Sequence, residues 1–264
     1  MRLDHVVVLV DELSAAIRDY TALGFRVTPG GEHKGLGTHN ALIPLGDGAY
    51  IELIAFKQRS FPAGTMLRKE DRLLKLMTAG RTPGEARMLA WETARGGLVD
   101  FALLPDDIEA DLKGARARGL AMEGPLPGSR LRPDGQRVAW QFGIPAAWAL
   151  PFLCADVTAR SLRVPEGPAR EHPNGATGVA RIVVGVNDLA ASASRYEALL
   201  GVPRRRGAPA EAVEFALGPT TIALVVAVGD EGPCALFLRT RNTSAPPLLG
   251  PSRTHGARIE WENT

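Results

Sequence analysis

Two polar residues interrupt apolar runs near the start of the chain. His5 lies in LDHVVVLV at positions 3–10, and Glu52 lies in AYIELIA at positions 49–55. An imidazole and a carboxylate can together hold a divalent metal, and a carboxylate can also act as a general base. A lone histidine in such a strand is more often a core residue, whereas a buried carboxylate is costly unless it is paired or bound to metal. We therefore take this pair as the candidate site, with a salt bridge from Glu52 to an arginine as the alternative.

Two further histidines lie in and beside the glycine-rich stretch between these runs. His39 begins a predicted strand over residues 38–45, and its alternation with Ala41 and Ile43 places it on an inward-facing side. We expect His39 to bind substrate or to supply a metal ligand, with a loop-capping role as the alternative. His33 precedes it in the loop, where we expect it either to line a substrate pocket or to be exposed.

A second group of candidates lies further along the chain. Asp100 interrupts the run LVDFALL and is either a metal ligand or the salt-bridge partner of an arginine such as Arg132 or Arg137. Arg130 and Arg132, in GSRLRPDG, could bind an anionic substrate group through paired hydrogen bonds, with a solvated loop as the alternative. Trp140 has the apolar body of a pocket wall, and core packing is its alternative role.

The segments around these residues predict a strand, a helix and then three strands. Residues 3–10 are dense in β-branched side chains, which favours a buried strand. Asp11 and Glu12 suit the positive end of a helix, whose apolar stripe continues at helical spacing until Gly24. Because side chains alternate along a strand, His5 faces away from the valines that pack on this helix. The later strands are predicted over residues 25–27, 38–45 and 49–55, the first of them broken by Pro29.

The same pattern recurs along the chain. An offset of 95 residues takes Leu13 to Ile108 and Gly24 to Gly119, which indicates a second strand-and-helix unit. An offset of 176 residues takes Leu13 to Leu189, which indicates a third. Self-similarity at fixed offsets is typical of repeated modules. A fourth copy is eroded, because its strand-like segments 234–239 and 257–261 have no helix between them.

The repeats divide the chain into a domain of two paired modules, a linker and a degenerate C-terminal part. These cover residues 1–157 (modules 1–57 and 96–157), 158–178 and 179–264. The linker prediction rests on the proline content of that stretch. The insertion between the two modules, residues 58–95, contains a predicted helix over residues 66–77 that could cover the site.

These modules resemble the vicinal oxygen chelate superfamily and, more narrowly, its glyoxalase-like domain family. The resemblance covers residues 1–157 well and the C-terminal part loosely. It is carried by LDHVVVLVDELSAAIRDYTALGFRV, GEHKGLGTHNALIPLGDGAYIEL and PGSRLRPDGQRVAW. It implies an α+β fold in which βαβββ modules curl into cup-shaped mixed sheets around a divalent metal held by His and Glu. A fold of this kind accommodates many reactions, so the resemblance indicates the fold more strongly than the chemistry.

The resemblance implies that His5 and Glu52 occupy metal-ligand positions, with Asp100 or His39 as further ligands. An imidazole with carboxylates suits Zn, Fe, Mn, Ni or Co. The second module departs from the pattern, because Asp100 stands for the His and a residue near Ala155 or Asp156 for the Glu. In the third module the corresponding residues are Arg181 and Ala223. Any chemistry is therefore expected in the first two modules.

The composition excludes several classes of protein. The 264 residues have a formal net charge of +2 and are 45% hydrophobic and 23% charged, which gives no indication of a nucleic-acid partner. No apolar run approaches the ~20 residues of a membrane helix, and no signal peptide is visible. Two cysteines without metal-type spacing suit a cytoplasmic setting. The motifs of serine hydrolases, phosphate-binding loops, zinc proteases and dinucleotide-binding proteins are absent.

Three kinds of function remain open. The first is a metal-dependent lyase or isomerase of the glyoxalase type, in which Glu52 moves a proton on a small oxygenated substrate, or a ring-cleaving dioxygenase if the metal is iron. The second is a non-catalytic protein that binds or sequesters a small molecule. The third is an assembly module, since a second chain could complete the C-terminal pairing as a homodimer.

Overall fold

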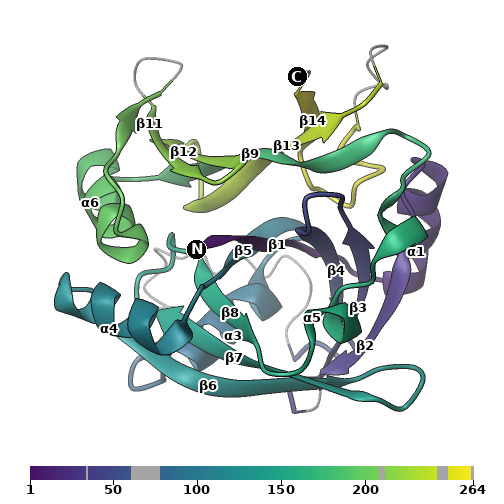
Figure 1. Cartoon of the computed structure of the whole chain (residues 1–264), viewed down its shortest axis with the longest axis horizontal. Helices are drawn as coiled ribbons and strands as arrows, with labels where there is room; N and C mark the ends of the chain where they lie inside the picture. The colour runs from purple at the N-terminus through teal and green to yellow at the C-terminus, as the bar shows by residue number, and fades with distance from the viewer. Residues whose placement is uncertain (34, 61–77, 208–211, 243–248, 263–264) are drawn as a thin grey trace.

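A closed barrel and a separate sheet make up the molecule (Figure 1). The computed structural model describes residues 1–33, 35–60, 78–207, 212–242 and 249–262. The helix predicted over residues 66–77 lies outside the described residues. Within them, no helix is long and apolar enough to cross a membrane.

The barrel consists of two βαβββ modules. The first contains β1 (Arg2–Leu9), α1 (Leu13–Ala22), β2 (Thr28–His33), β3 (Thr38–Pro44) and β4 (Tyr50–Phe56). The second contains β5 (Gly97–Leu104), α4 (Ile108–Ala117), β6 (Met122–Leu131), β7 (Arg137–Pro145) and β8 (Phe152–Asp156). In each module the first strand pairs in parallel with the last, and β1 pairs antiparallel with β5. The predicted α+β class and repeated modules are confirmed.

The modules close into a barrel because β2 pairs with β6. Glu32 lies opposite Leu131 and His33 opposite Arg130. The prediction of a second strand over residues 25–27, broken by Pro29, was wrong, since β2 begins at Thr28 and runs through this proline to His33. At Gly31, where φ is +138°, an added Cβ would lie 2.1 Å from the Leu131 carbonyl oxygen. The glycines therefore allow the close approach of the two strands at this seam.

The C-terminal sheet repeats the pairing of the barrel with fewer strands. Its elements are β9 (Ala176–Val186), α6 (Leu189–Leu200), β10 (Arg205–Arg206), β11 (Val213–Leu217), β12 (Thr220–Val226), β13 (Gly232–Thr240) and β14 (Ile259–Glu262). β9 pairs in parallel with β12 and antiparallel with β13, and β13 pairs in parallel with β14. In the described residues, β13 and β14 thus take the places of the first and last strands of a fourth module.

Two hydrophobic clusters lie on opposite sides of the barrel wall. Val6, Val8 and Val10 belong to a large outer core that includes α1 and the strands of the C-terminal sheet. Val7 and Leu9 belong to a smaller cluster on the inner side. As predicted from alternation, Val6, Val8 and Val10 lie on the helix side and Val7 on the other. Leu3 also joins the outer core, because a register shift between Leu3 and His5 changes the side that β1 presents.

The stretch predicted as a linker packs against the barrel. It contains the short helix α5 (Arg160–Arg163) and the 3-10 helix η1 (Gly167–Arg170). The Arg163 side chain is 2% exposed and ion-pairs with Asp4 at 2.8 Å. Arg160 pairs with Asp4 at 2.6 Å and with Asp156 at 3.0 Å. Proline content led to the linker prediction, but it did not reveal the two arginines that dock this segment.

The buried Asp4 carboxylate gives a prediction for stability. Asp4→Asn leaves the Arg163 charge without its main partner, and breaking one side of a buried pair typically costs about 3–5 kcal/mol. Urea unfolding at neutral pH measures the loss. The exposed Asp134→Asn, which weakens a surface pair with Arg132, serves as the control and should change stability little.

The same residue predicts a pH dependence. Although burial raises the pKa of Asp4, the Arg163 charge and the His5 hydrogen bond hold it well below its usual value. The stabilisation is therefore present above the unfolded pKa of about 4 and is lost as the pH falls towards the folded pKa. Wild-type stability should fall more steeply than that of Asp4→Asn below about pH 4. Equal stability of the two proteins at pH 7 would contradict this account.

Candidate functional site

A cavity of about 380 Å³ lies inside the barrel. One part of its wall is polar and carries His5, His33, Glu52 and Arg130, while the larger part is apolar. The helix α3 (Pro83–Thr93), from the insertion, covers part of the cavity with Arg87, Met88 and Trp91. A concave, mainly apolar pocket with a few convergent polar groups is the usual form of a small-molecule site.

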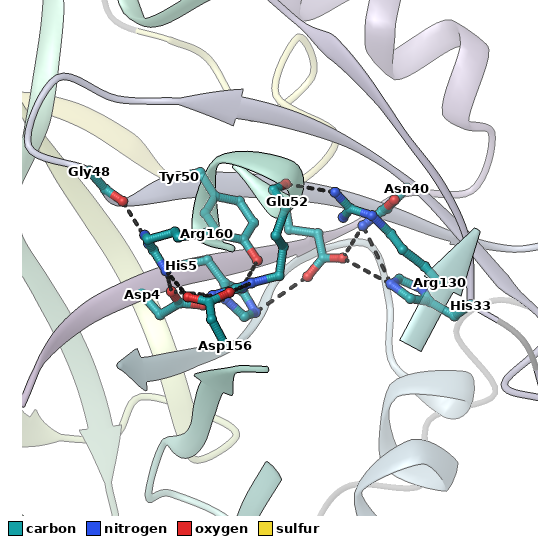
Figure 2. Close-up of polar contacts among 11 residues, drawn as sticks. Asp4, His5, His33, Asn40, Gly48, Tyr50, Glu52, Arg130, Asp156 and Arg160 are labelled. Carbon is teal, nitrogen blue, oxygen red and sulfur yellow. Dashed lines mark hydrogen bonds and ion pairs between the residues drawn. The ribbon is translucent and has the colours of Figure 1, made fainter. Parts of the chain in front are cut away.

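Glu52 forms the centre of the polar wall (Figure 2). It lies in β4, paired with Val7 of β1, and is 6% exposed. Its Oε2 lies 3.3 Å from His5 Nε2, and its Oε1 accepts a hydrogen bond of 2.5 Å from Asn40 Nδ2. His33 Nε2 lies 3.7 Å from the same Oε1. The carboxylate is thus held by groups from β1, β2 and β3.

His5 links Glu52 to the buried arginines. Its Nδ1 donates a hydrogen bond of 2.7 Å to Asp4 Oδ2, and its ring stacks on Tyr50 at 4.7 Å between centroids. The register shift in β1 brings the neighbouring Asp4 within reach of this ring. Asp4 in turn accepts from Arg163. The sequence identified His5, but nothing in it pointed to Arg163, which comes from 158 positions further along the chain.

His33 is held in a similar way. Its Nδ1 lies 2.9 Å from Thr38 Oγ1, and its ring packs edge-on against Trp140 at 5.9 Å. The ring also lines the cavity, so of the two expectations for His33 the structure agrees with a place in the pocket wall and not with exposure. Asn40, which the sequence did not single out, follows Thr38 by two residues on the same face of β3. Strand alternation was the signal that could have found it.

The surroundings of Glu52 keep it ionised. Burial raises the pKa of this carboxyl, but the nearby charges of His5 and His33 and the hydrogen bond from Asn40 outweigh that effect and lower it. Burial lowers the pKa of the His33 imidazole, so its neutral form is favoured. At neutral pH the polar wall therefore offers an ionised base beside an imidazole that can accept or donate a proton.

Arg130 occupies the same end of the cavity and is 4% exposed. Its Nη2 donates to the carbonyl oxygen of Arg163 at 2.7 Å, and its Nε is buried without a partner. Trp140 lines the cavity as predicted for a pocket wall, and its Nε1 also has no partner among the described residues. Gly128 leaves room for this indole, since a Cβ there would lie 2.3 Å from Nε1.

Three of the candidates from the sequence, His39, Arg132 and Asp100, do not line the cavity. His39 does not line the cavity, because Thr38 and Asn40 are the residues of β3 that face Glu52 and His33. The expectation that it shares the inward side with Ala41 and Ile43 reversed the two faces of this strand, since those two residues belong to the outer core. Arg132 instead pairs with Asp134 at 2.9 Å and donates to the Leu162 carbonyl.

Asp100 is held away from Glu52 by an ion pair of its own. It accepts from Arg87 Nε and Nη2 at 2.5 and 2.8 Å and from Trp91 Nε1 at 2.9 Å. The salt-bridge alternative for Asp100 is thus the one observed, but with Arg87 of α3 in place of Arg132 or Arg137. The pair fastens the insertion to the barrel.

The register of the second module also corrects the expected equivalent of Glu52. Val7 lies opposite Glu52, and the matching pair in the second module is Ala102 opposite Phe152. The equivalent is therefore Phe152, and Asp156 instead binds Arg160 and Arg163. In the third module the pair is Val183 opposite Ala223, as predicted.

The donor set does not match the metal site that the resemblance implied. Within the described residues, no group of three or more His, Cys, Asp or Glu side chains could hold a metal ion. His5, His33 and Glu52 come nearest, but both oxygens of Glu52 are already engaged and Arg130 adds a positive charge. The second module contributes Phe152, which has no donor atom. We therefore derive no chemical step through a metal.

Comparisons with known proteins agree with this architecture. A family model described as a glyoxalase-like domain matches residues 3–200. A hypothetical protein from Staphylococcus aureus has a similar structure, with a TM-score of 0.76, 15% identity and 99% coverage of both chains. No curated protein matches the sequence.

Two further structures are similar to this chain at the level of fold. One is a fusion protein of a xylose isomerase-like TIM barrel and 4-hydroxyphenylpyruvate dioxygenase, with a TM-score of 0.51, 14% identity and coverage of 92% of this chain and 36% of the other. The other is a mutant of 4-hydroxymandelate synthase from Streptomyces coelicolor, with a TM-score of 0.50, 14% identity and coverage of 91% and 72%. Together with the match over residues 3–200, the pairing of the modules shows that this chain belongs to the glyoxalase-like domain family of the vicinal oxygen chelate type.

Proposed function

We propose that the barrel cavity is the active site of a lyase or isomerase in which Glu52 acts as the general base on a small oxygenated substrate. The observation that carries the proposal is a buried carboxylate, kept ionised, at the polar end of an otherwise apolar cavity. Perturbed ionisable groups in a cavity are typical of catalytic sites. A carboxylate of this kind is already deprotonated at neutral pH.

The proposed step is removal of a proton from a carbon next to a carbonyl group. Glu52 takes the proton, and the electron pair of the C–H bond moves into the carbonyl to form an enolate. If the carbon that lost the proton carries a hydroxyl group, that hydroxyl gives its proton to the enolate oxygen, and return of the first proton to the former carbonyl carbon gives isomerisation. If the next carbon on the other side carries a leaving group, the electron pair of the enolate expels it with its bonding electrons and gives elimination. His5 and His33, which face Glu52, are placed to carry the proton or to donate to the developing oxyanion.

Hydrogen–deuterium exchange tests this step without knowledge of the full substrate. Small 2-oxo acids and α-hydroxy ketones are incubated in D2O, and proton NMR follows the loss of the C–H signal beside the carbonyl. We expect exchange above background with wild type and a rate lower by about 100-fold or more with Glu52→Gln, since general-base catalysis contributes roughly 10²–10⁴-fold. The variant keeps the shape of the side chain and an oxygen that can accept from Asn40.

The exposed Glu109→Gln in α4 is the matched control and should exchange at the wild-type rate. If Glu52→Gln exchanges as fast as wild type, the role of Glu52 as a base is wrong.

The apolar lining and the lack of a polar counterpart of Glu52 in the second module favour a binding protein as the second candidate. Compounds that stabilise the protein against heat but are recovered without exchange or conversion would support that alternative.

The divalent metal expected from the resemblance has its own test. Because both oxygens of Glu52 are engaged, we expect wild type resupplied with Zn, Fe(II), Mn, Ni or Co to retain far less than one equivalent after dialysis. Elemental analysis should give the same low value for His5→Ala and Glu52→Ala. One full equivalent in wild type that is lost in both variants would restore the metal-dependent reactions, including the ring-cleaving dioxygenase.

We also propose that two copies of the chain pair through the C-terminal sheet. Its end strands are β10 and β14. β10 consists of Arg205 and Arg206, both exposed, whereas β14 carries Glu260 and Glu262. A two-fold axis would bring the positive end strand of one copy to the negative end strand of the other.

Light scattering at micromolar concentration checks the pairing. We expect the mass of a dimer for wild type and of a monomer for the double variant Arg205→Glu, Arg206→Glu. The double variant Arg18→Glu, Lys113→Glu alters exposed charges on α1 and α4 instead and should remain a dimer. A monomeric wild type would contradict the proposal.

A further inference from the structure

The charge of Arg130 has no counter-ion within the residues that the structure describes. Its contact with the Arg163 carbonyl uses Nη2, and its Nε is buried without a partner among the described residues. The other buried arginines are paired, Arg163 with Asp4 and Arg87 with Asp100. Arg130 therefore stands apart from every other buried cation at the cavity.

A buried guanidinium without a partner is costly, because burial removes water without supplying another acceptor. The pKa of Arg130 reflects this, since burial lowers it despite the favourable effects of Tyr50 and Glu52. Glu52 does not serve as the partner, as its oxygens are engaged by Asn40, His5 and His33. An anionic group that enters the cavity would supply the missing acceptor through charge-assisted hydrogen bonds.

The cavity-lining side chains of β6 and β7 indicate the chemical character of the rest of such a ligand. Arg130 lies opposite Val138, Gly128 opposite Trp140, and Leu126 opposite Phe142. Successive cavity-lining positions on these strands therefore change from the guanidinium to an indole and then to a leucine and a phenyl ring. Leu126 lies four positions before Arg130 in β6, which corresponds to ~13 Å at about 3.3 Å per strand residue.

Rings from other elements continue this apolar wall. Phe152 of β8 packs edge-on against Phe142 at 5.8 Å, and Trp91 of α3 lies 6.3 Å from Phe152. Such walls favour a flat aromatic body, because ring pairs add stabilisation beyond the area that they bury. Among the described residues, the cavity thus combines one buried cation that lacks a counter-ion with an aromatic wall.

We propose that the cavity takes a small aromatic monocarboxylate, with the carboxylate on Arg130 and the ring between Trp140, Phe142 and Phe152. This inference deepens the proposed function and rests on the same cavity, but it concerns binding and not proton transfer. It places the carboxylate of the substrate on Arg130, close to Glu52, so that the carbon chain that follows the carboxylate lies near the base. Arg130 is then the residue that selects acids over neutral analogues.

Calorimetric titration with a matched pair of probes tests the proposal. The probes are 3-phenylpropionate and its neutral analogue 3-phenylpropionamide, with acetate as an anion that lacks the ring. We expect wild type to bind the acid about tenfold or more tightly than the amide, a difference of about 1.4 kcal/mol. Acetate should bind far more weakly than the aromatic acid, because it leaves the aromatic wall unfilled.

Variants assign the preference to Arg130. Arg130→Met should lower the affinity for the acid by about tenfold or more while changing the affinity for the amide by less than about twofold. Arg137→Met alters an exposed arginine on the same pair of strands and should bind both probes like wild type. Arg130→Gln serves the same purpose if the Met variant fails to fold, which circular dichroism shows.

The outcomes separate this proposal from the role of Glu52. Glu52→Gln should bind the acid at least as tightly as wild type, because it removes a negative charge close to Arg130, whatever its exchange rate. The proposal is overturned if wild type binds acid and amide equally, if it binds neither at millimolar concentration, or if a folded Arg130 variant keeps the wild-type preference for the acid.

Discussion

The burial of β1 on both faces is the constraint on which the rest of the structure depends. One face builds the outer core with α1 and the C-terminal sheet, and the other faces the barrel interior. A strand buried on both sides cannot slip by one residue without moving a valine into the cavity and His5 into the outer core. The register between Val7 and Glu52 is therefore strongly determined, and with it the position of the base.

The bulge at the start of β1 adds polar chemistry to this apolar strand. It lets Asp4 and His5 lie together, where regular alternation would place them on opposite faces. Asp4 then requires a counter-charge, which comes from Arg160 and Arg163 in the segment between the barrel and the C-terminal sheet. The position of that segment thus follows from the need to neutralise one buried carboxylate.

The two modules of the barrel have diverged into different roles. The first keeps His5 and Glu52 at the cavity. In the second, the equivalent positions hold Asp100, which fastens α3 through Arg87, and Phe152, which forms part of the aromatic wall. One module thus supplies the polar groups, and the other supplies Arg130, the rings and the anchor for the covering helix. This division explains how a symmetrical barrel acquires a cavity with one polar end.

The sequence by itself determined the repeats, the helices of the three modules and the faces of β1, because periodic apolar patterns and helix caps are local signals. It also indicated His5 and Glu52, since polar residues in apolar strands need a special reason. Only the tertiary structure decided which distant residues meet them. Asn40, Arg130 and Arg163 come from three other elements, and their convergence depends on register, a bulge and barrel closure. Such contacts leave no periodic trace in the chain, so the partners of Glu52 and the unpaired charge of Arg130 could be seen only once the strands were in place.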